Sequence, residues 1–223
     1  MASKRPNRSG GSGAQLEFFD ATIRHQIGLM RVAGALRNET WDLLDKTETD
    51  LRLQIQDRLS RGRGIRSPAG VDRLRGLLRE VQEIRNAAWG DVKQLWRTRL
   101  GELAKREPVI MSAILKTVSP TVLDPEPVLA SVARRIAMQT PFEGRTLSQW
   151  GQSMASSDIR RIQDQINIGM VQGESGQAIA RRVVGTGSLR GRDGVTQAAR
   201  RHTEAITRTA VNHTTNQARR EWF

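Results

Sequence analysis

The strongest constraint on the fold is a pair of long stripes of apolar residues spaced three and four positions apart. Because an α-helix turns once every 3.6 residues, this spacing puts apolar side chains on one helix face. The first stripe comprises Leu16, Phe19, Ile23, Ile27 and Met30, and after a stretch of small residues it resumes with Trp41, Leu44, Leu51, Ile55 and Leu59. The second comprises Val71, Leu74, Leu78, Val81, Ile84, Ala88, Val92, Leu95 and Leu103. The chain therefore predicts two long amphipathic helices.

A single helix over residues 14–60 would be about 65 Å long, more than a small globular domain needs. Gly34, Asn38 and Thr47–Thr49 are weak helix formers, so we expect the helix to break near one of them.

The segment RGRGIRSPAG separates the two stripes and predicts a turn. Gly62 and Gly64 permit positive φ, and Ser67 before Pro68 suits an N-cap followed by proline at the first helical position. Two long helices joined by a short loop favour an antiparallel hairpin. Their spacing suits coiled-coil packing and the arm of a plain helical bundle equally well.

Further along the chain, prolines between residues 108 and 141 predict short helices with breaks, among them VIMSAILKTV and VLASVARRIAMQ. A second unit begins at TPFEGRTLSQW and reads helix, glycine-rich loop, helix. Its first apolar stripe is Ile159, Ile162, Ile166 and Met170, and Ser175 is placed to cap the helix SGQAIARRVV.

No segment shows convincing strand alternation, so the predicted class is all-α. We expect a long antiparallel helical hairpin followed by a compact helical C-terminal domain. The predicted divisions are a flexible basic arm at 1–13, the hairpin at 14–107, short helices and proline-rich connectors at 108–140, and the C-terminal domain at 141–223.

The net charge of the 223-residue chain is +13, and arginine supplies most of the positive charge. Arginine forms forked hydrogen bonds to phosphates and carboxylates, so this bias suits anionic partners. The alternative is an arginine-rich codon bias with no functional reason. The absence of cysteine excludes disulfides, thiolate metal sites and a cysteine nucleophile. No apolar run approaches the ~20 residues of a membrane span, and with no signal-peptide core at the N-terminus we expect synthesis into the cytoplasm.

Residues 201–220 gather many groups that could carry chemistry in one predicted helix. His202 and His213 are eleven residues apart, about 16 Å along a helix, too far to share one metal ion. No catalytic triad pattern or nucleophile elbow is present, and GTGSLRGRDG lacks the Lys-Ser/Thr of a phosphate-binding loop. We therefore predict no metal, no cofactor and no enzymatic activity.

Two sets of polar residues in this region are candidates for binding. Arg208, Asn212 and Asn216 share one helix face. Buried, they would fix helix register; exposed, they would donate hydrogen bonds to phosphate. The densest basic patch is the better candidate for contact with duplex DNA, although a solvated loop would look the same. It comprises Arg181, Arg182, Arg190, Arg192, Arg200 and Arg201.

Three C-terminal segments resemble, in order, the head-morphogenesis proteins of tailed bacteriophages, the minor head proteins of the Mu F type. They are PFEGRTLSQW, IRRIQDQINIGMVQGESGQAIARRVVGT and GRDGVTQAARRHTEAITRTAVNHTTNQAR. The resemblance covers about residues 140–223. Its motifs are a G-x-x-x-G-x-S pair of turns and a closing helix, here Gly169, Gly173, Ser175, Arg208, Thr209, Asn212, Asn216 and Arg219.

This resemblance implies a non-enzymatic virion protein in few copies, located in the head interior or portal region after assembly in the host cytoplasm. It implies contact with portal or major capsid protein and non-specific contact with packaged double-stranded DNA, while the hairpin's apolar stripe offers a surface for self-association. Many relatives continue past the closing helix, whereas this sequence stops at Phe223. Two alternatives are a non-virion, sequence-independent nucleic-acid-binding helical protein and a nuclease or toxin-linked domain. The latter would need a carboxylate cluster that the sequence lacks.

Overall fold

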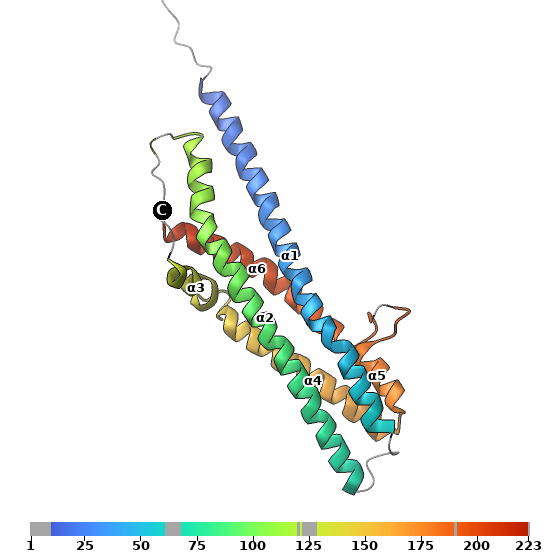
Figure 1. Cartoon of the computed structure of the whole chain (residues 1–223). Helices are drawn as coiled ribbons and strands as arrows, with labels where there is room; N and C mark the ends of the chain where they lie inside the picture. The colour runs from blue at the N-terminus through green and yellow to red at the C-terminus, as the bar shows by residue number, and fades with distance from the viewer. Residues whose placement is uncertain (1–9, 61–67, 120, 122–128, 190, 223) are drawn as a thin grey trace, which may run out of the picture.

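The computed structural model describes residues 10–60, 68–119, 121, 129–189 and 191–222. Within these ranges the chain forms helices and a single isolated β-bridge between Phe142 and Arg145, and no strands, so the all-α prediction is confirmed. Figure 1 shows an elongated bundle built along two long helices. The helices are α1 (Gly10–Ser60), α2 (Pro68–Lys116), α3 (Ala130–Gln139), α4 (Leu147–Gln172), α5 (Gly176–Val184) and α6 (Gln197–Arg220).

The two long helices lie side by side and run in opposite directions (Figure 1). Polar contacts between the two helices show the same antiparallel direction. Arg58 of α1 pairs with Glu80 of α2, and Glu39 accepts from Arg99 Nε at 3.0 Å. Nearer the start of α1, His25 Nε2 lies 3.0 Å from Glu107 Oε1. Residue numbers fall along α1 as they rise along α2, which is the pairing of an antiparallel hairpin. The predicted turn residues Gly62, Gly64 and Ser67 lie outside the described residues.

α1 is one continuous helix of 51 residues, so the predicted break near Gly34, Asn38 or Thr47–Thr49 is wrong. The Thr47 hydroxyl donates to the Leu44 carbonyl at 2.8 Å, which satisfies this side chain without leaving the helix. Leu44 and Leu51, on either side of the threonines, are buried. Tertiary packing therefore outweighs the weak intrinsic helix propensity of these residues.

α2 continues through Pro108 to Lys116, so the hairpin does not end at residue 107 and VIMSAILKTV is not a separate helix. A proline inside a helix removes one backbone hydrogen bond and crowds the preceding turn. Here both sides of the proline are anchored, because Ala104 and Ile114 are buried and the fully buried Glu107 binds α6. The other predicted piece, VLASVARRIAMQ, does form a helix, α3.

The core consists mainly of two clusters along the hairpin. One surrounds Trp89 and Trp96 and joins α1 and α2 to α3, α4 and α6. The other lies nearer the hairpin turn and packs Leu51 of α1 against Ile162 of α4 and Ile179 of α5. The predicted apolar stripe of α4 is buried in this second cluster and beside it. Residues 141–223 therefore share their core with the hairpin instead of enclosing one of their own.

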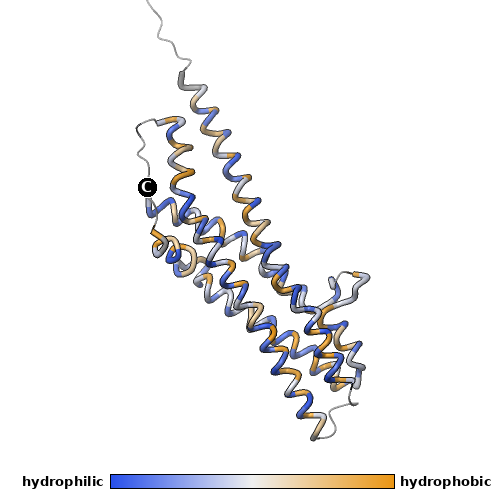
Figure 2. Tube along the Cα trace, in the orientation of Figure 1, coloured by the Kyte–Doolittle hydropathy of each residue, from blue (hydrophilic) through white to orange (hydrophobic). Residues whose placement is uncertain are grey.

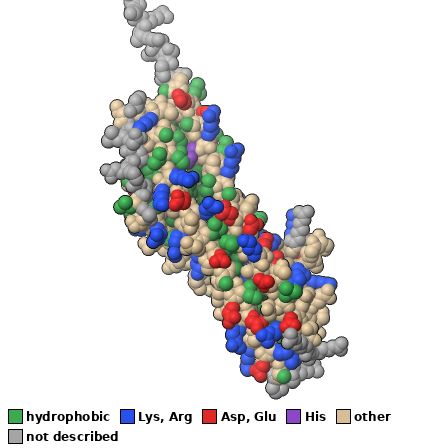
Figure 3. Space-filling model, in the orientation of Figure 1, with side chains coloured by type: hydrophobic (Ala, Val, Ile, Leu, Met, Phe, Trp, Pro, Cys, Tyr) green, Lys and Arg blue, Asp and Glu red, His purple; other side chains and the backbone are tan. Residues whose placement is uncertain are grey.

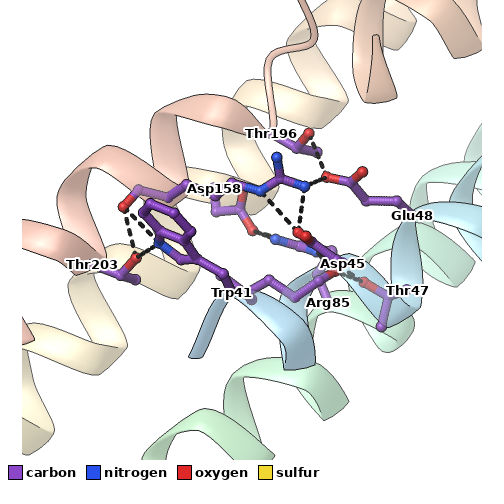
Figure 4. Close-up of polar contacts among 10 residues, drawn as sticks. Trp41, Asp45, Thr47, Glu48, Arg85, Asp158, Thr196 and Thr203 are labelled. Atoms are coloured by element: carbon purple, nitrogen blue, oxygen red, sulfur yellow. Dashed lines mark hydrogen bonds and ion pairs between the residues drawn. The ribbon is translucent and has the colours of Figure 1, made fainter. Parts of the chain in front are cut away.

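A buried ion pair joins three of these helices (Figure 4). The side chains of Arg85 on α2 and Asp158 on α4 are 1% and 2% exposed. Arg85 Nε donates to Asp158 Oδ2 at 2.8 Å, and Trp89 Nε1 donates to the same oxygen at 2.9 Å. The Arg85 guanidinium also donates to the Leu44 carbonyl and the Thr47 hydroxyl of α1. The buried guanidinium thus finds acceptors on two neighbouring helices.

A second set of polar contacts fastens α6 to α1, next to the first (Figure 4). Arg200 donates from Nε to Asp45 Oδ1 at 2.8 Å and from Nη2 to Glu48 Oε1 at 3.1 Å. The Thr196 hydroxyl donates to the same Glu48 oxygen, and Trp41 Nε1 donates to the Arg200 carbonyl. Burial raises the pKa of Glu48, while the charge of Arg200 opposes that rise.

We predict that Asp158→Ala lowers the free energy of unfolding by about 3–5 kcal/mol, because it leaves the Arg85 charge buried without a partner. Urea denaturation followed by circular dichroism measures this change. The double variant Arg85→Met/Asp158→Leu should recover most of the loss, since neither charge remains. Asp72→Ala, which removes an exposed pair with Arg75, is the control and should cause no measurable loss. Unchanged stability of Asp158→Ala would show that the pair does not hold the helices together.

Candidate nucleic-acid interface

Two of the six arginines predicted to contact DNA form ion pairs with carboxylates of the same chain. The Arg200 side chain is 15% exposed and pairs with Asp45 and Glu48. Arg182 donates from Nε to both carboxylate oxygens of Glu174, at 2.9 and 2.8 Å. Both guanidiniums are therefore engaged by carboxylates of the same chain, and they hold helices or loops together. Arg190 lies outside the described residues.

The other three arginines are exposed and lie on three different elements. Arg181 lies in the last turn of α5, Arg192 follows in the next loop, and Arg201 lies on α6. The described part of the loop is held by close backbone packing at Gly194 and by Asp193, whose carboxylate accepts from the Thr186 N–H at 2.8 Å. That hydrogen bond lowers the pKa of Asp193, so the loop carries a negative charge beside Arg192.

A groove lies between α4 and α6, and His202, the residue after Arg201, is one of those that line it. The groove has a volume of about 280 Å³ and combines hydroxyls, an imidazole and apolar side chains. It is lined by Trp150, Ser153, Met154, Ser157, His202, Ala205 and Ile206.

Three arginines interact with residues that line this groove. The Arg145 guanidinium lies 5.0 Å from the centre of the Trp150 ring and donates to Ser153 Oγ at 3.0 Å. Burial lowers the pKa of His202, and the charges of Arg161 and Arg201 lower it further. The charged groups that act on this imidazole are thus both cations, which disfavour its protonated form.

Arg201 was among the arginines predicted from the sequence, whereas Arg145 and Arg161 were not. Arg145 comes just before the N-cap of α4, and Arg161 lies on that helix, so only the packing of α4 against α6 brings Arg161 near His202. On the hairpin face in Figure 3, by contrast, basic and acidic side chains are interspersed.

The groove is chemically suited to phosphate. Hydroxyls and guanidiniums donate to phosphate oxygens, which fixes a nucleic acid by its backbone without reading its sequence. Trp150 is partly buried against Phe142, with ring centres 6.2 Å apart, so stacking with an inserted base is not favoured.

The G-x-x-x-G-x-S pattern forms the corner between α4 and α5. A Cβ at Gly169 would lie 2.5 Å from Ile179 Cγ1, so only glycine permits this approach. Gly173 ends α4 in the left-handed conformation, with φ of 72°. Ser175 Oγ accepts from the Ala178 N–H at 3.2 Å, which confirms the predicted N-cap of α5. These three residues have a structural role.

The closing-helix motif divides into exposed and structural members. Arg208, Asn212 and Asn216 are exposed along one face of α6, which is the arrangement that the binding interpretation required. Thr209 donates to a carbonyl of its own helix. Arg219 donates from Nε to the fully buried Glu107 at 2.7 Å and so ties α6 to α2.

The two histidines of α6 have separate environments. His213 Nε2 donates to the Thr140 carbonyl at 3.2 Å and packs on the Phe142 ring, while burial lowers its pKa. In the described ranges, no group of three or more His, Asp or Glu side chains is arranged to hold a metal ion. Nor does any helix of those ranges have the length and apolarity needed to cross a bilayer.

Comparisons with protein-family models, with curated proteins and with solved structures return no match to this chain. The likeness to head-morphogenesis proteins therefore rests on the sequence motifs alone.

We predict that Gly169→Ala lowers the free energy of unfolding by about 1–3 kcal/mol, because the added methyl overlaps Ile179 and α5 must move. Gly90→Ala is the matched control: Gly90 is an exposed helical glycine with open space around it, and its replacement should stabilise by about 0.5–1 kcal/mol. Thermal and urea unfolding of both variants measure the difference. Equal effects of the two substitutions would contradict the close approach of α4 and α5.

Proposed function

We propose that this chain is a non-enzymatic minor structural protein of a tailed-bacteriophage head, and that it holds packaged DNA through the groove between α4 and α6. The observation that carries the DNA part is that arginines act on polar residues that line this groove: Arg145 donates to Ser153, and the charges of Arg161 and Arg201 act on His202. The order of the C-terminal motifs supports the virion part.

The geometry favours contact with the DNA backbone. A protein that neutralises phosphates releases condensed counterions, so its affinity falls steeply as salt rises and depends little on base sequence. The net charge of +13 adds a long-range attraction that speeds encounter with DNA. Such binding suits a protein that meets whatever stretch of genome is packed beside it.

The elongated shape suits assembly. α1 extends past the end of α2 in Figure 1. Apolar residues recur along α1 in Figure 2, including the part that extends past α2. An exposed apolar helix face of this kind is typical of a surface that packs against another protein, such as portal, capsid or a second copy.

We predict that Arg161→Ala/Arg201→Ala weakens binding to a 30-base-pair duplex at least tenfold at 100 mM salt, measured by fluorescence anisotropy. Loss of two phosphate contacts should also reduce the slope of log affinity against log salt by about 2. Arg79→Ala/Arg97→Ala removes two exposed arginines of α2 and is the matched control, with a much smaller effect. Two duplexes of unrelated sequence should bind alike. Equal loss in both double variants would show that the charge of the whole surface, and not this groove, binds DNA.

The virion part has a separate test, since the same groove would serve a non-virion nucleic-acid-binding protein. Mass spectrometry of purified particles and imaging without imposed symmetry should find the chain inside the head or at the portal. Its absence from mature particles would favour the non-virion alternative.

A further inference from the structure

The first half of α1 presents an apolar face that no other described part of the chain covers. It consists of large side chains that are 44–74% exposed, whereas Leu29 and Leu36 on another side of the helix are buried. We call this the α1 face: Leu16, Phe19, Ile23, Ile27 and Met30.

The spacing of the α1 face is symmetric about Ile23. Its residues are separated by three, four, four and three positions, and at 100° per residue all five lie within about 40° of the direction of Ile23. A second copy of the helix, laid antiparallel with the two-fold axis at Ile23, therefore matches each residue with an apolar partner. Leu16 then meets Met30 of the second copy, and Phe19 meets Ile27 of the second copy. This order suits a two-fold contact, in which the same patch of both copies meets.

The charges beside the α1 face are divided by sign about Ile23, with acidic residues before it and basic residues after it. Glu17, Asp20, Arg24 and Arg31 all lie on one flank, between about 60° and 120° from Ile23. In an antiparallel helix pair, like flanks face each other. Arg24 then comes within about two residues' rise, ~3 Å along the axis, of the second copy's Asp20, and Arg31 comes equally near its Glu17. The two-fold axis repeats both contacts, which gives four opposite-charge pairs.

Parallel pairing would not use these charges. It would place the charged flank against the other flank, where Gln15, Thr22 and Gln26 are neutral. Within one chain, Asp20 and Arg24 already form an exposed pair at 2.6 Å, so both side chains lie free of the bundle for contacts with a second copy.

The position of the α1 face in the fold leaves room for a second helix. His25 faces α2 through Glu107, and Leu29 borders the grooves on both sides of α1, so the bundle occupies other sides of the helix. α1 extends past the end of α2 (Figure 1). In an antiparallel pair, the remaining helices of the second copy would lie at the opposite end of the paired α1 helices.

From this symmetry of shape and charge we infer that the α1 face pairs antiparallel with the α1 face of a second copy. The contact spans about 22 Å of helix, which is short for a stable interface, so the dimer should form only at roughly micromolar concentrations. This inference does not depend on DNA binding or on a place in a virion.

Sedimentation equilibrium of the full chain tests the contact. The wild-type chain should pass from monomer to dimer as concentration rises, and Ile23→Glu should weaken the dimer at least tenfold. Val171→Glu is the matched control, because Val171 on α4 is 74% exposed, as Met30 is, but lies outside the α1 face. Circular dichroism should show the same helix content in all three proteins.

Charge reversal tests the antiparallel register. Glu17→Arg/Asp20→Arg makes the flank wholly basic, and Arg24→Glu/Arg31→Glu makes it wholly acidic. Each variant alone should be monomeric because like charges meet, and an equimolar mixture should restore dimers at the wild-type concentration range. Failure of the mixture to dimerise would contradict the antiparallel pairing.

Because the chain has no cysteine, single-cysteine variants give an independent measure. Ile23→Cys should cross-link to itself under mild oxidation, whereas Phe19→Cys should cross-link efficiently only when mixed with Ile27→Cys. Val171→Cys sets the background. A wild-type chain that stays monomeric up to hundreds of micromolar, with Ile23→Cys cross-linking no faster than Val171→Cys, would overturn the inference and assign the α1 face to a different protein. DNA binding has a separate readout, so either proposal can fail alone.

Discussion

The buried pair of Arg85 and Asp158 is the interaction on which the arrangement of the helices depends. Two charges removed from water need compensation from a precise set of partners, because attraction between them offsets desolvation only when the remaining donors are also satisfied. Here those partners come from α1, α2 and α4, so sliding one helix along another would leave a charge unpaired. Apolar packing in the two clusters tolerates such shifts better, since it has little directionality.

Pairing with carboxylates of the same chain also determines which arginines are available for other partners. Arg200, next to the buried pair, pairs with two carboxylates of α1, and Arg219 pairs with the buried Glu107. A net positive charge in the sequence is therefore a poor guide to which arginines remain unpaired. Around His202, by contrast, the charges that act on the imidazole are those of Arg161 and Arg201.

α1 is longer than the bundle requires. Its second half packs against the other helices, while its first half keeps an apolar face in the open. An exposed apolar face of this kind is typical of an interaction surface, and it is the basis of the proposed contact with a second copy. The His25–Glu107 contact near this end fixes the helix against α2, which presents the face on a rigid support.

The sequence alone determined what depends on neighbours along the chain. Helical periodicity, the N-cap at Ser175 and the glycine at 173 involve residues a few positions apart, so they could be predicted and were found. Only the tertiary structure decided that α1 does not break at its weak helix formers, that α2 passes through Pro108, and that 141–223 packs along the hairpin. It also decided which arginines are neutralised, because Arg200 and Asp45 are 155 residues apart. Burial and charge pairing depend on packing in space, and no local pattern records them.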